Sequence, residues 1–291
     1  MNHIVDPTSG LPESRLYTFI DGPREFALYF LEGQKLIHDL VLRHDLRGGA
    51  LAYFRDAVLS VQPMIALIKH GEQLGFYLDS ERPYFRLKIE AGHHGGTRCA
   101  LIPESLDQPP DSMRGVVRVL KLFPRNRPPY QSVLSIDGLT LREVVNRVLR
   151  ESYQVHSAVL VSEDSDQSVM LHQLPPLKGE YDYSYDVLRE RRDGLERALR
   201  ERLAAALHEP EAIREAFDAL GFRLIASRAV GFQCPCSRER VIRSIRLAVG
   251  EEFEQLFDPG QALLEITCEY CKSVYRIGRD DLGRATGHQL N

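Results

Sequence analysis

The alternation of apolar and polar positions predicts a mixed α/β region from about residue 17 to residue 177. Strands are expected where apolar residues alternate or cluster between turn residues, at residues 26–31, 75–78, 85–89 and 115–120. The second and third of these read as a hairpin. Residues 49–59 and 141–149 place apolar side chains at three- and four-residue spacings, which predicts amphipathic helices. Proline pairs at 109–110 and 128–129 indicate loops.

A different pattern occupies residues 181–220. Ten of the fourteen residues from 189 to 202 are charged, with both signs present, and Leu195, Leu199, Leu203 and Leu207 form one row at four-residue spacing. This pattern favours helices, but a helix with one narrow apolar row is marginal alone in water. We therefore expect this segment to depend on docking, either as a permanently packed helix or as a segment poised to unfold.

The C-terminal pattern predicts a small module. Helices are expected at residues 237–247 and 251–257, and a hairpin at residues 264–267 and 274–277. About sixty residues offer little burial, so such a module usually needs a metal or disulfides. The predicted fold class is therefore α+β, with an α/β N-terminal domain at residues 1–178, a charged helical linker at 179–230 and the module at 231–291.

Composition narrows the classes of function. The chain has 291 residues, 43% hydrophobic and 27% charged, and its net charge is −4, with a mean hydropathy of −0.27. This balance is typical of globular proteins and gives no field that would attract nucleic acid or an anionic bilayer. The first residues lack the pattern of a secretory signal, and no apolar run approaches a membrane span. We expect a cytoplasmic protein with neither nucleic-acid nor membrane partners.

Four of the five cysteines form two local pairs. Cys234 and Cys236 have C-x-C spacing, a 31-residue insert follows, and Cys268 and Cys271 have C-x-x-C spacing. In a reducing compartment such pairs indicate metal binding more often than structural disulfides. Four thiolates complete a tetrahedral zinc site with no position left for an activated water. We expect one zinc ion per chain in a structural or regulatory role.

The same cysteines suit a redox switch. A C-x-C disulfide closes a very small ring, and strained disulfides are readily reversed. Proximity along the chain favours pairing of Cys234 with Cys236 and of Cys268 with Cys271. Neither disulfide would replace the tie that zinc makes across the insert. Closing such a loop corresponds to roughly 3–4 kcal/mol, and structural zinc contributes on the order of 10 kcal/mol or more to folding.

The residues around these cysteines resemble a known family. Residues 232–241 and 266–275 are similar to the zinc-binding end of the heat-shock protein 33 family, the redox-regulated 33 kDa chaperonins of bacteria. Residues 130–133, 152–157 and 170–175 resemble further signatures of that family, so the likeness covers roughly residues 129–282. It implies an α/β domain, a helical linker and a zinc module whose ligands fall on Cys234, Cys236, Cys268 and Cys271.

The resemblance also implies an activity. Family members are ATP-independent holdases that are quiet when reduced and zinc-loaded. Oxidation releases zinc, unfolds the module and linker, and exposes apolar surface for unfolding client proteins and for a second copy of the chain. In agreement, the sequence has no G-x-x-x-x-G-K-[ST] loop for a nucleotide.

Other candidate sites are weaker. Cys99 lies close to His93 and His94, but no third ligand is evident in the sequence, so a turn followed by a strand cysteine is the simpler interpretation. His44 and His156 lack the G-x-S-x-G elbow of a hydrolase triad. We do not expect an enzyme.

The main alternative is a constitutive zinc-ribbon module that binds a protein partner without redox switching. Residues 231–291 contain eight Lys or Arg and nine Asp or Glu, which is not the basic balance that nucleic acid requires.

Overall fold

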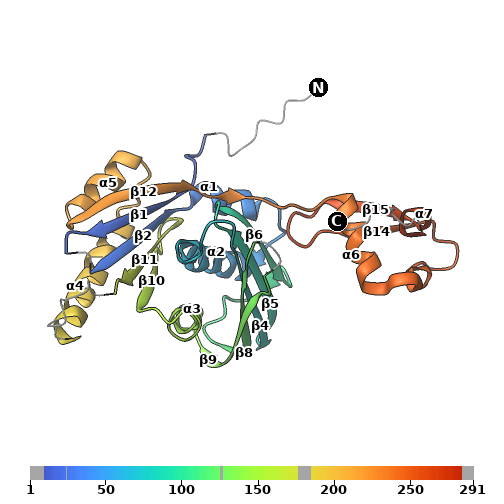
Figure 1. The fold of residues 1–291 in the computed structure, drawn as a ribbon, viewed down its shortest axis with the longest axis horizontal. Coiled ribbons are helices and arrows are strands. Elements are labelled where there is room, and N and C mark those ends of the chain that lie inside the picture. The colour runs from blue at the N-terminus through green and yellow to red at the C-terminus, as the bar shows by residue number, and fades with distance from the viewer. Residues whose placement is uncertain (1–9, 24, 125–126, 176–184, 284–291) are drawn as a thin grey trace. The chain divides into compact units, whose positions relative to one another are not determined.

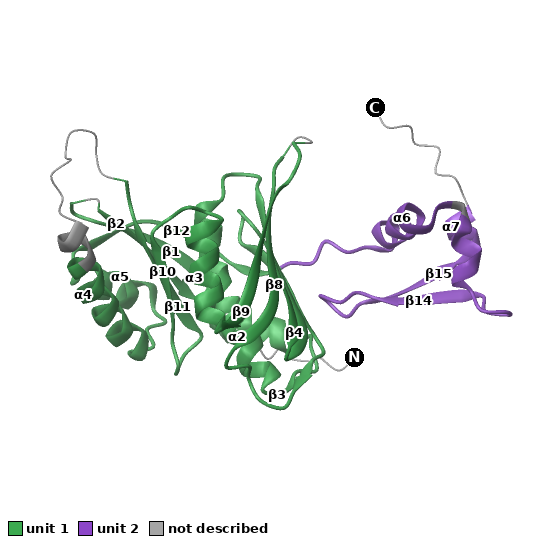
Figure 2. Ribbon diagram, turned by 90° about the horizontal axis from the view of Figure 1, so that it is seen from below, with its two compact units in different colours: residues 1–232 green, residues 233–291 purple. Residues whose placement is uncertain are grey.

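The computed structural model describes residues 10–23, 25–124, 127–175 and 185–283, and for residues 185–189 and 251 it describes the backbone alone. The predicted boundary between residues 178 and 179, and the predicted start of the charged segment at residue 181, lie outside these ranges. The chain divides into two compact units, residues 1–232 (unit 1) and residues 233–291 (unit 2), coloured separately in Figure 2. Each unit is described by itself.

Unit 1 contains two large sheets. In the first sheet the strand order is β10-β11-β2-β1-β12, and every neighbouring pair is antiparallel. Its strands are β1 Arg15–Asp21, β2 Phe26–Glu32, β10 Ser157–Val161, β11 Gln167–Gln173 and β12 Phe222–Ala229. Side chains alternate across the sheet, and both faces are apolar, so both need a cover.

The second sheet has the order β13-β6-β5-β4-β8-β9, antiparallel except for the parallel pair of β13 and β6. Its strands are β4 Gln73–Arg82, β5 Tyr84–Gly92, β6 Gly96–Ile102, β8 Met113–Leu122, β9 Tyr130–Leu139 and β13 Gly231–Phe232. A short parallel pair joins β3 Arg47–Gly48 to β7 Ser105–Leu106. The four predicted strands and the predicted hairpin are confirmed.

Helices fill the space between the two sheets. They are α1 Gln34–Val41, α2 Ala50–Val61, the 3-10 helix η1 Gln62–Leu67 and α3 Leu141–Glu151. Helix α2 contacts strands of both sheets, as Figure 1 shows. Thr140 caps α3 in a capping box with Glu143, which satisfies backbone donors at the start of the helix. Both predicted helices are confirmed, and this layer forms the main core of unit 1.

The opposite face of the first sheet is covered by two helices, α4 Tyr185–Ala204 and α5 Pro210–Asp218 (Figure 1). The predicted leucine row makes the contact: Leu199 is fully buried and Leu203 is 3% exposed, while Leu195 and Leu207 pack beside them. We call α4 and α5 the helical cover. The predicted linker also contains a strand, because β12 follows α5 and pairs with β1. Within the described residues, no helix is long and apolar enough to cross a membrane.

Unit 2 is built from a helix, a hairpin and short helical turns. Its elements are α6 Arg238–Val249, the 3-10 helix η2 Gly250–Leu256, β14 Leu263–Thr267, β15 Val274–Gly278 and α7 Arg279–Gly283. The predicted helix at residues 251–257 is therefore a 3-10 helix, and the predicted hairpin is confirmed. The structure is α+β, as expected.

Candidate metal centre

Two separate segments of unit 2 supply the four clustered cysteines. Cys234 and Cys236 lie in the extended segment before α6, which begins after the N-cap Ser237. Cys268 and Cys271 lie in the turn between β14 and β15. That turn is closed by backbone hydrogen bonds from the Cys268 N–H to the Ser273 carbonyl and from the Lys272 N–H to the Cys268 carbonyl, both 2.9 Å.

The fold brings the four sulfur atoms together. All four Sγ atoms lie within 4.8 Å of one another. The Sγ atoms of Cys234 and Cys268 are 3.8 Å apart, and those of Cys236 and Cys271 are 3.1 Å apart. Zn–S bonds of about 2.3 Å in a tetrahedral site place sulfurs about 3.8 Å apart. The predicted residues therefore have the arrangement that tetrathiolate binding requires, and all four are free thiols.

The closeness of the four sulfur atoms shifts the pKa values of their thiols. Burial and the adjacent Cys271 and Cys234 thiols raise the pKa of Cys236 to about 12, against an opposing hydrogen bond from Tyr275. Burial acts in the same direction on Cys271, but hydrogen bonds with Ser273 and Cys236 lower its pKa to about 6. A thiolate beside a thiol suits a site where a cation can replace the shared proton.

The donor set fits zinc. Four sulfur donors with no carboxylate or imidazole among them favour a soft or borderline metal such as zinc over magnesium or calcium. The Tyr275 hydroxyl donates to the Cys236 Sγ at 3.0 Å, and Ser273 lies 3.3 Å from the Cys271 Sγ. Such outer hydrogen bonds orient ligands around a metal.

The apolar core of unit 2 is very small. Among its described residues only Phe257, Ile277 and Leu282 are buried hydrophobic side chains, and α6 buries none. Val241, Ile242 and Ile245, which the sequence placed on one face of this helix, are partly buried against that cluster. So small a core does not stabilise a domain of this size alone.

Cys99 is separate from this cluster. It lies in β6 of unit 1, is fully buried in the main core and makes no disulfide. Burial raises the pKa of its thiol well above the usual range, which keeps it protonated and unreactive. The interpretation of Cys99 as a strand cysteine is confirmed.

The helical cover hides a second feature that the sequence did not reveal. Beneath it lies an aromatic and aliphatic face of the first sheet. Phe217 of α5 packs against Phe19 and Phe30, with ring centroids 4.8 and 5.1 Å apart. The remaining buried sheet residues of this cluster are Tyr17, Phe26, Leu28, Leu160, Val169, Leu171 and Phe222. In the sequence, the alternation of apolar residues along each strand was the only signal for this buried face. Alternation does not show which strands become neighbours in the sheet.

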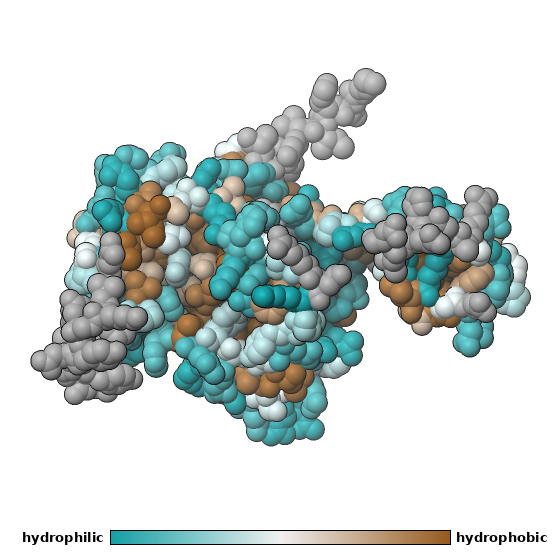
Figure 3. All heavy atoms as spheres, viewed as in Figure 1, coloured by the Kyte–Doolittle hydropathy of each residue, from teal (hydrophilic) through white to brown (hydrophobic). Residues whose placement is uncertain are grey.

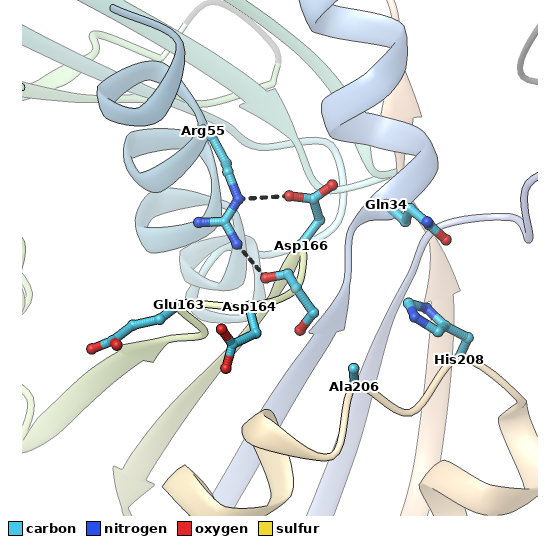
Figure 4. A pocket seen from close by; sticks show the side chains of 8 residues that line it. Gln34, Arg55, Glu163, Asp164, Asp166, Ala206 and His208 are labelled. Atoms are coloured by element: carbon cyan, nitrogen blue, oxygen red, sulfur yellow. Dashed lines mark hydrogen bonds and ion pairs between the residues drawn. The ribbon is translucent and has the colours of Figure 1, made fainter. Parts of the chain in front are cut away.

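Polar contacts hold the cover at the connection between α4 and α5. Figure 4 shows Ala206 and His208 of this connection where they line a pocket opposite Arg55. The Nδ1 atom of His208 lies 3.1 Å from Oε1 of Glu32, a carboxylate that is only 1% exposed. The Gln167 amide donates to the Leu207 carbonyl at 2.5 Å, and the Ser162 hydroxyl donates to the Leu203 carbonyl at 3.3 Å. Nearer the start of α4, Arg191 forms ion pairs with the buried Asp21, at 2.6 Å, and with Glu25.

Comparison with known proteins assigns this architecture. A family model described as Hsp33 protein matches residues 14–278. The 33 kDa chaperonin of Nitrosococcus oceani is 26% identical over 253 residues, covering 85% of each chain. That of Geobacter sulfurreducens is 26% identical over 267 residues, covering 86% of this chain and 87% of its own. A 33 kDa chaperonin structure from Thermotoga maritima is 14% identical with a TM-score of 0.72, covering 93% of this chain and 96% of that one.

The fold and the site define a two-unit α+β protein with a four-thiol cluster in its smaller unit. This chain belongs to the Hsp33 family. The resemblance drawn from residues 129–282 is confirmed, and the family match extends back to residue 14.

Proposed function

We propose that this chain is a redox-regulated, ATP-independent chaperone of the holdase type. Membership of the Hsp33 family and relatives named chaperonins support a chaperone role. The redox control rests on one observation: four sulfur atoms within 4.8 Å join two distant segments of a unit that buries only three apolar side chains among its described residues. The thiols therefore occupy the place where a crosslink has the largest effect on folding.

In the reduced state Cys234, Cys236, Cys268 and Cys271 bind one zinc ion per chain. When bound, the zinc supplies a crosslink between the segment before α6 and the β14–β15 turn. Tyr275 and Ser273 orient two of the sulfurs. The four-sulfur donor set leaves no place for a reacting water, which agrees with a role in binding rather than catalysis.

Oxidation removes this crosslink. Two equivalents of peroxide take two electrons from each pair of zinc-bound thiolates and, with four protons from the solvent, form two disulfides and four waters. Sulfurs held in disulfides no longer bind zinc, so the zinc ion is released. If neighbours pair, Cys234 with Cys236 and Cys268 with Cys271, the two segments separate and unit 2 unfolds. Sulfur atoms of different pairs also lie close together, at 3.8 Å for Cys234 and Cys268 and 3.1 Å for Cys236 and Cys271, and cross-pairing would keep the segments tied. Peptide mapping of the oxidised protein distinguishes the two outcomes.

Activation requires the helical cover to leave the first sheet. The chain runs from α5 through β12 and β13 directly to Cys234. Loss of structure after residue 232 would therefore reach the cover through β12, whose pairing with β1 must then weaken as well. The face beneath it includes Phe19, Phe30 and Phe222, each at most 1% exposed while covered. While the cover is in place, the side of the molecule drawn in Figure 3 shows only separate apolar patches among polar residues on its outer surface.

An uncovered face of this kind suits two partners. Unfolding client proteins expose apolar segments that would bind it, and a second copy of the chain would bind it in a homodimer. We place the protein in the cytoplasm, where thiols are kept reduced until oxidative stress. Neither nucleotide nor nucleic acid nor a membrane has a role in this proposal.

One experiment tests the proposal. Light scattering follows the aggregation of a heat-unfolding client in the presence of zinc-loaded protein and of peroxide-treated protein, with zinc release measured in parallel. We expect suppression of aggregation only after oxidation, together with release of one zinc per chain. Equal suppression in both states would instead favour the alternative of a constitutive zinc-ribbon protein-binding module.

A further inference from the structure

Three histidines gather on two neighbouring turns of unit 1. His70 lies in the turn between η1 and β4, while His93 and His94 lie in the turn between β5 and β6. One ring nitrogen from each lies within 4.8 Å of those of the other two. Centroid distances are 5.5 Å for His70 and His93, 4.9 Å for His70 and His94, and 5.6 Å for His93 and His94, with interplanar angles of 72°, 88° and 89°. We call these residues the histidine cluster.

Backbone contacts fix the two turns against each other. The His93 N–H donates to the Glu72 carbonyl at 3.0 Å, and the Gly95 N–H donates to the Gly92 carbonyl at 2.9 Å. Gly95 has φ of +93°, and a Cβ there would lie 2.0 Å from the Ala229 carbonyl oxygen. Only glycine fits this close approach. The backbone positions that carry the three imidazoles are therefore fixed before any ligand binds.

One atom of the cluster lacks a partner. The Nδ1 atom of His93 is buried and makes no hydrogen bond in the described structure. A neutral imidazole carries one donor and one acceptor nitrogen, and leaving either buried without a partner costs free energy. A metal ion is one partner that an acceptor nitrogen can take.

We propose that His70, His93 and His94 form a second metal site, which binds a divalent transition-metal ion such as zinc. Three imidazoles favour zinc, nickel or copper and do not suit magnesium or calcium, which prefer oxygen donors. The guanidinium of Arg228, which donates to the His93 carbonyl at 2.6 Å, opposes a cation, whereas the Glu72 carboxylate favours it. This site is independent of the four cysteines and of the proposed switch.

Binding there has a structural consequence. The β5–β6 turn also contacts the end of β12 and the start of β13, because the Gly231 N–H donates to the Gly95 carbonyl at 3.1 Å and Arg228 donates to His93. A metal bound by the histidine cluster rigidifies the turn that holds this part of the chain. Within unit 1, a bound metal would therefore stabilise the positions of β12 and β13, the strands that lead toward Cys234.

Calorimetric titration with zinc tests the site. The full-length chain is used without an affinity tag, reduced, and already loaded with one zinc per chain. We expect one further equivalent to bind. His70→Ala and His94→Ala remove exposed side chains that the fold does not need, and each should weaken this second binding at least about tenfold. The control His156→Ala changes an exposed histidine outside the cluster and should bind like the wild type.

A second measurement, by nuclear magnetic resonance, tests the same site without calorimetry. Paramagnetic nickel added to the zinc-loaded protein should broaden the ring resonances of His70, His93 and His94 and leave those of His156 sharp. Failure to bind a further equivalent, binding by both cluster variants as tight as that of the wild type, or broadening of all histidines alike would overturn the proposal.

Discussion

Units 1 and 2 differ sharply in how they are stabilised. Among the described residues, the main core of unit 1 holds 35 buried apolar side chains from two sheets and the helices between them. The cluster that the helical cover forms with the first sheet adds 13 more. Unit 2 holds three. Each fully buried aliphatic or aromatic side chain contributes about 1.5–3 kcal/mol relative to exposure, so the burial in unit 2 does not offset the entropy of ordering its residues.

Under the proposed function, this difference would let one protein combine a permanently folded unit with a unit whose folding depends on a bound metal. Hydrophobic burial does not respond to oxidants, whereas thiolate ligands do. Under the proposed function, oxidation of the four cysteines would therefore change unit 2 and leave the core of unit 1 intact. The helical cover is intermediate, since it belongs to unit 1 but adds only one layer of side chains to the first sheet.

The largest expected effect comes from removing one thiol of the cluster. Cys236→Ser should abolish tight zinc binding and unfold unit 2, because structural zinc contributes on the order of 10 kcal/mol or more. Unit 1 should keep its sheets. Amide hydrogen exchange of the reduced protein, read separately for residues 233–283 and for the two sheets, measures both effects. If the amides of unit 2 stay protected from exchange without metal, the contrast drawn between the two units is wrong.

Cys99→Ala is the matched control. It also removes a thiol, but one that is buried in β6 of unit 1. It should lower the stability of unit 1 modestly and leave one zinc ion bound at the four-cysteine site of each chain. A loss of zinc in this variant would indicate that unit 1 and the metal site are energetically linked.

The next largest effect is expected under the helical cover. Phe217→Ala deletes a ring that is 1% exposed and contacts Phe19 and Phe30, and such truncations cost about 3–5 kcal/mol. The cover should loosen, so reduced, zinc-loaded protein should already suppress client aggregation. Ile225→Ala, which removes a side chain 54% exposed on β12, is the control and should leave activity oxidant-dependent.

The sequence predicted the docking helix of this cover better than it predicted the strands on which the helix docks. The row from Leu195 to Leu207 showed that a helix must dock, because four-residue spacing places these side chains on one face. It did not show that the face beneath the cover combines residues of β1, β2, β10, β11 and β12, which lie far apart in the sequence. Likewise β12 was not predicted, since Phe222–Ala229 alternates weakly and its pairing with β1 depends on the whole sheet.

The two candidate metal sites also show that the sequence reveals local groupings of residues but not contacts between residues far apart in the chain. The cysteines form local pairs, so spacing alone indicated a shared site. His70 is separated from His93 by the whole of β4 and β5, and the metal interpretation of His93 and His94 failed for want of a third ligand. Only the register of the β4–β5 hairpin brings His70 beside them.

A smaller effect is expected at the polar end of the cover. His208→Ala removes the side-chain partner of the buried Glu32 carboxylate, which keeps its hydrogen bond from the Gln34 N–H. A hydrogen bond to a charged group contributes about 1.5–3 kcal/mol, and since His208 is half-exposed we expect about 1.5 kcal/mol. Denaturant unfolding of the zinc-loaded protein measures this loss. Arg214→Gln, on the exposed side of α5, should by contrast change stability very little.

The same pair predicts a pH dependence. Burial raises the pKa of Glu32, against opposing hydrogen bonds from His208 and the Gln34 N–H. The folded state therefore holds this proton more tightly than the unfolded state. The stabilisation is fully present below the unfolded pKa, near 4.5, and is lost as pH rises through the higher folded value. Glu32→Gln should flatten this part of the stability profile, and an unchanged slope would assign the dependence to other groups.

The smallest expected effect tests whether anything besides the sulfur cluster stabilises unit 2. Arg276 and Glu265 pair across the β14–β15 hairpin at 2.7 Å, with side chains 70% and 58% exposed. Exposed pairs of this kind contribute less than about 1 kcal/mol, because water screens the charges and ordering two long side chains costs entropy. Arg276→Gln should therefore leave zinc stoichiometry and hydrogen-exchange protection of unit 2 unchanged. If this substitution instead unfolded unit 2 while zinc was in excess, surface charge would rival the thiols as its source of stability, and the contrast between the two units would no longer explain the switch.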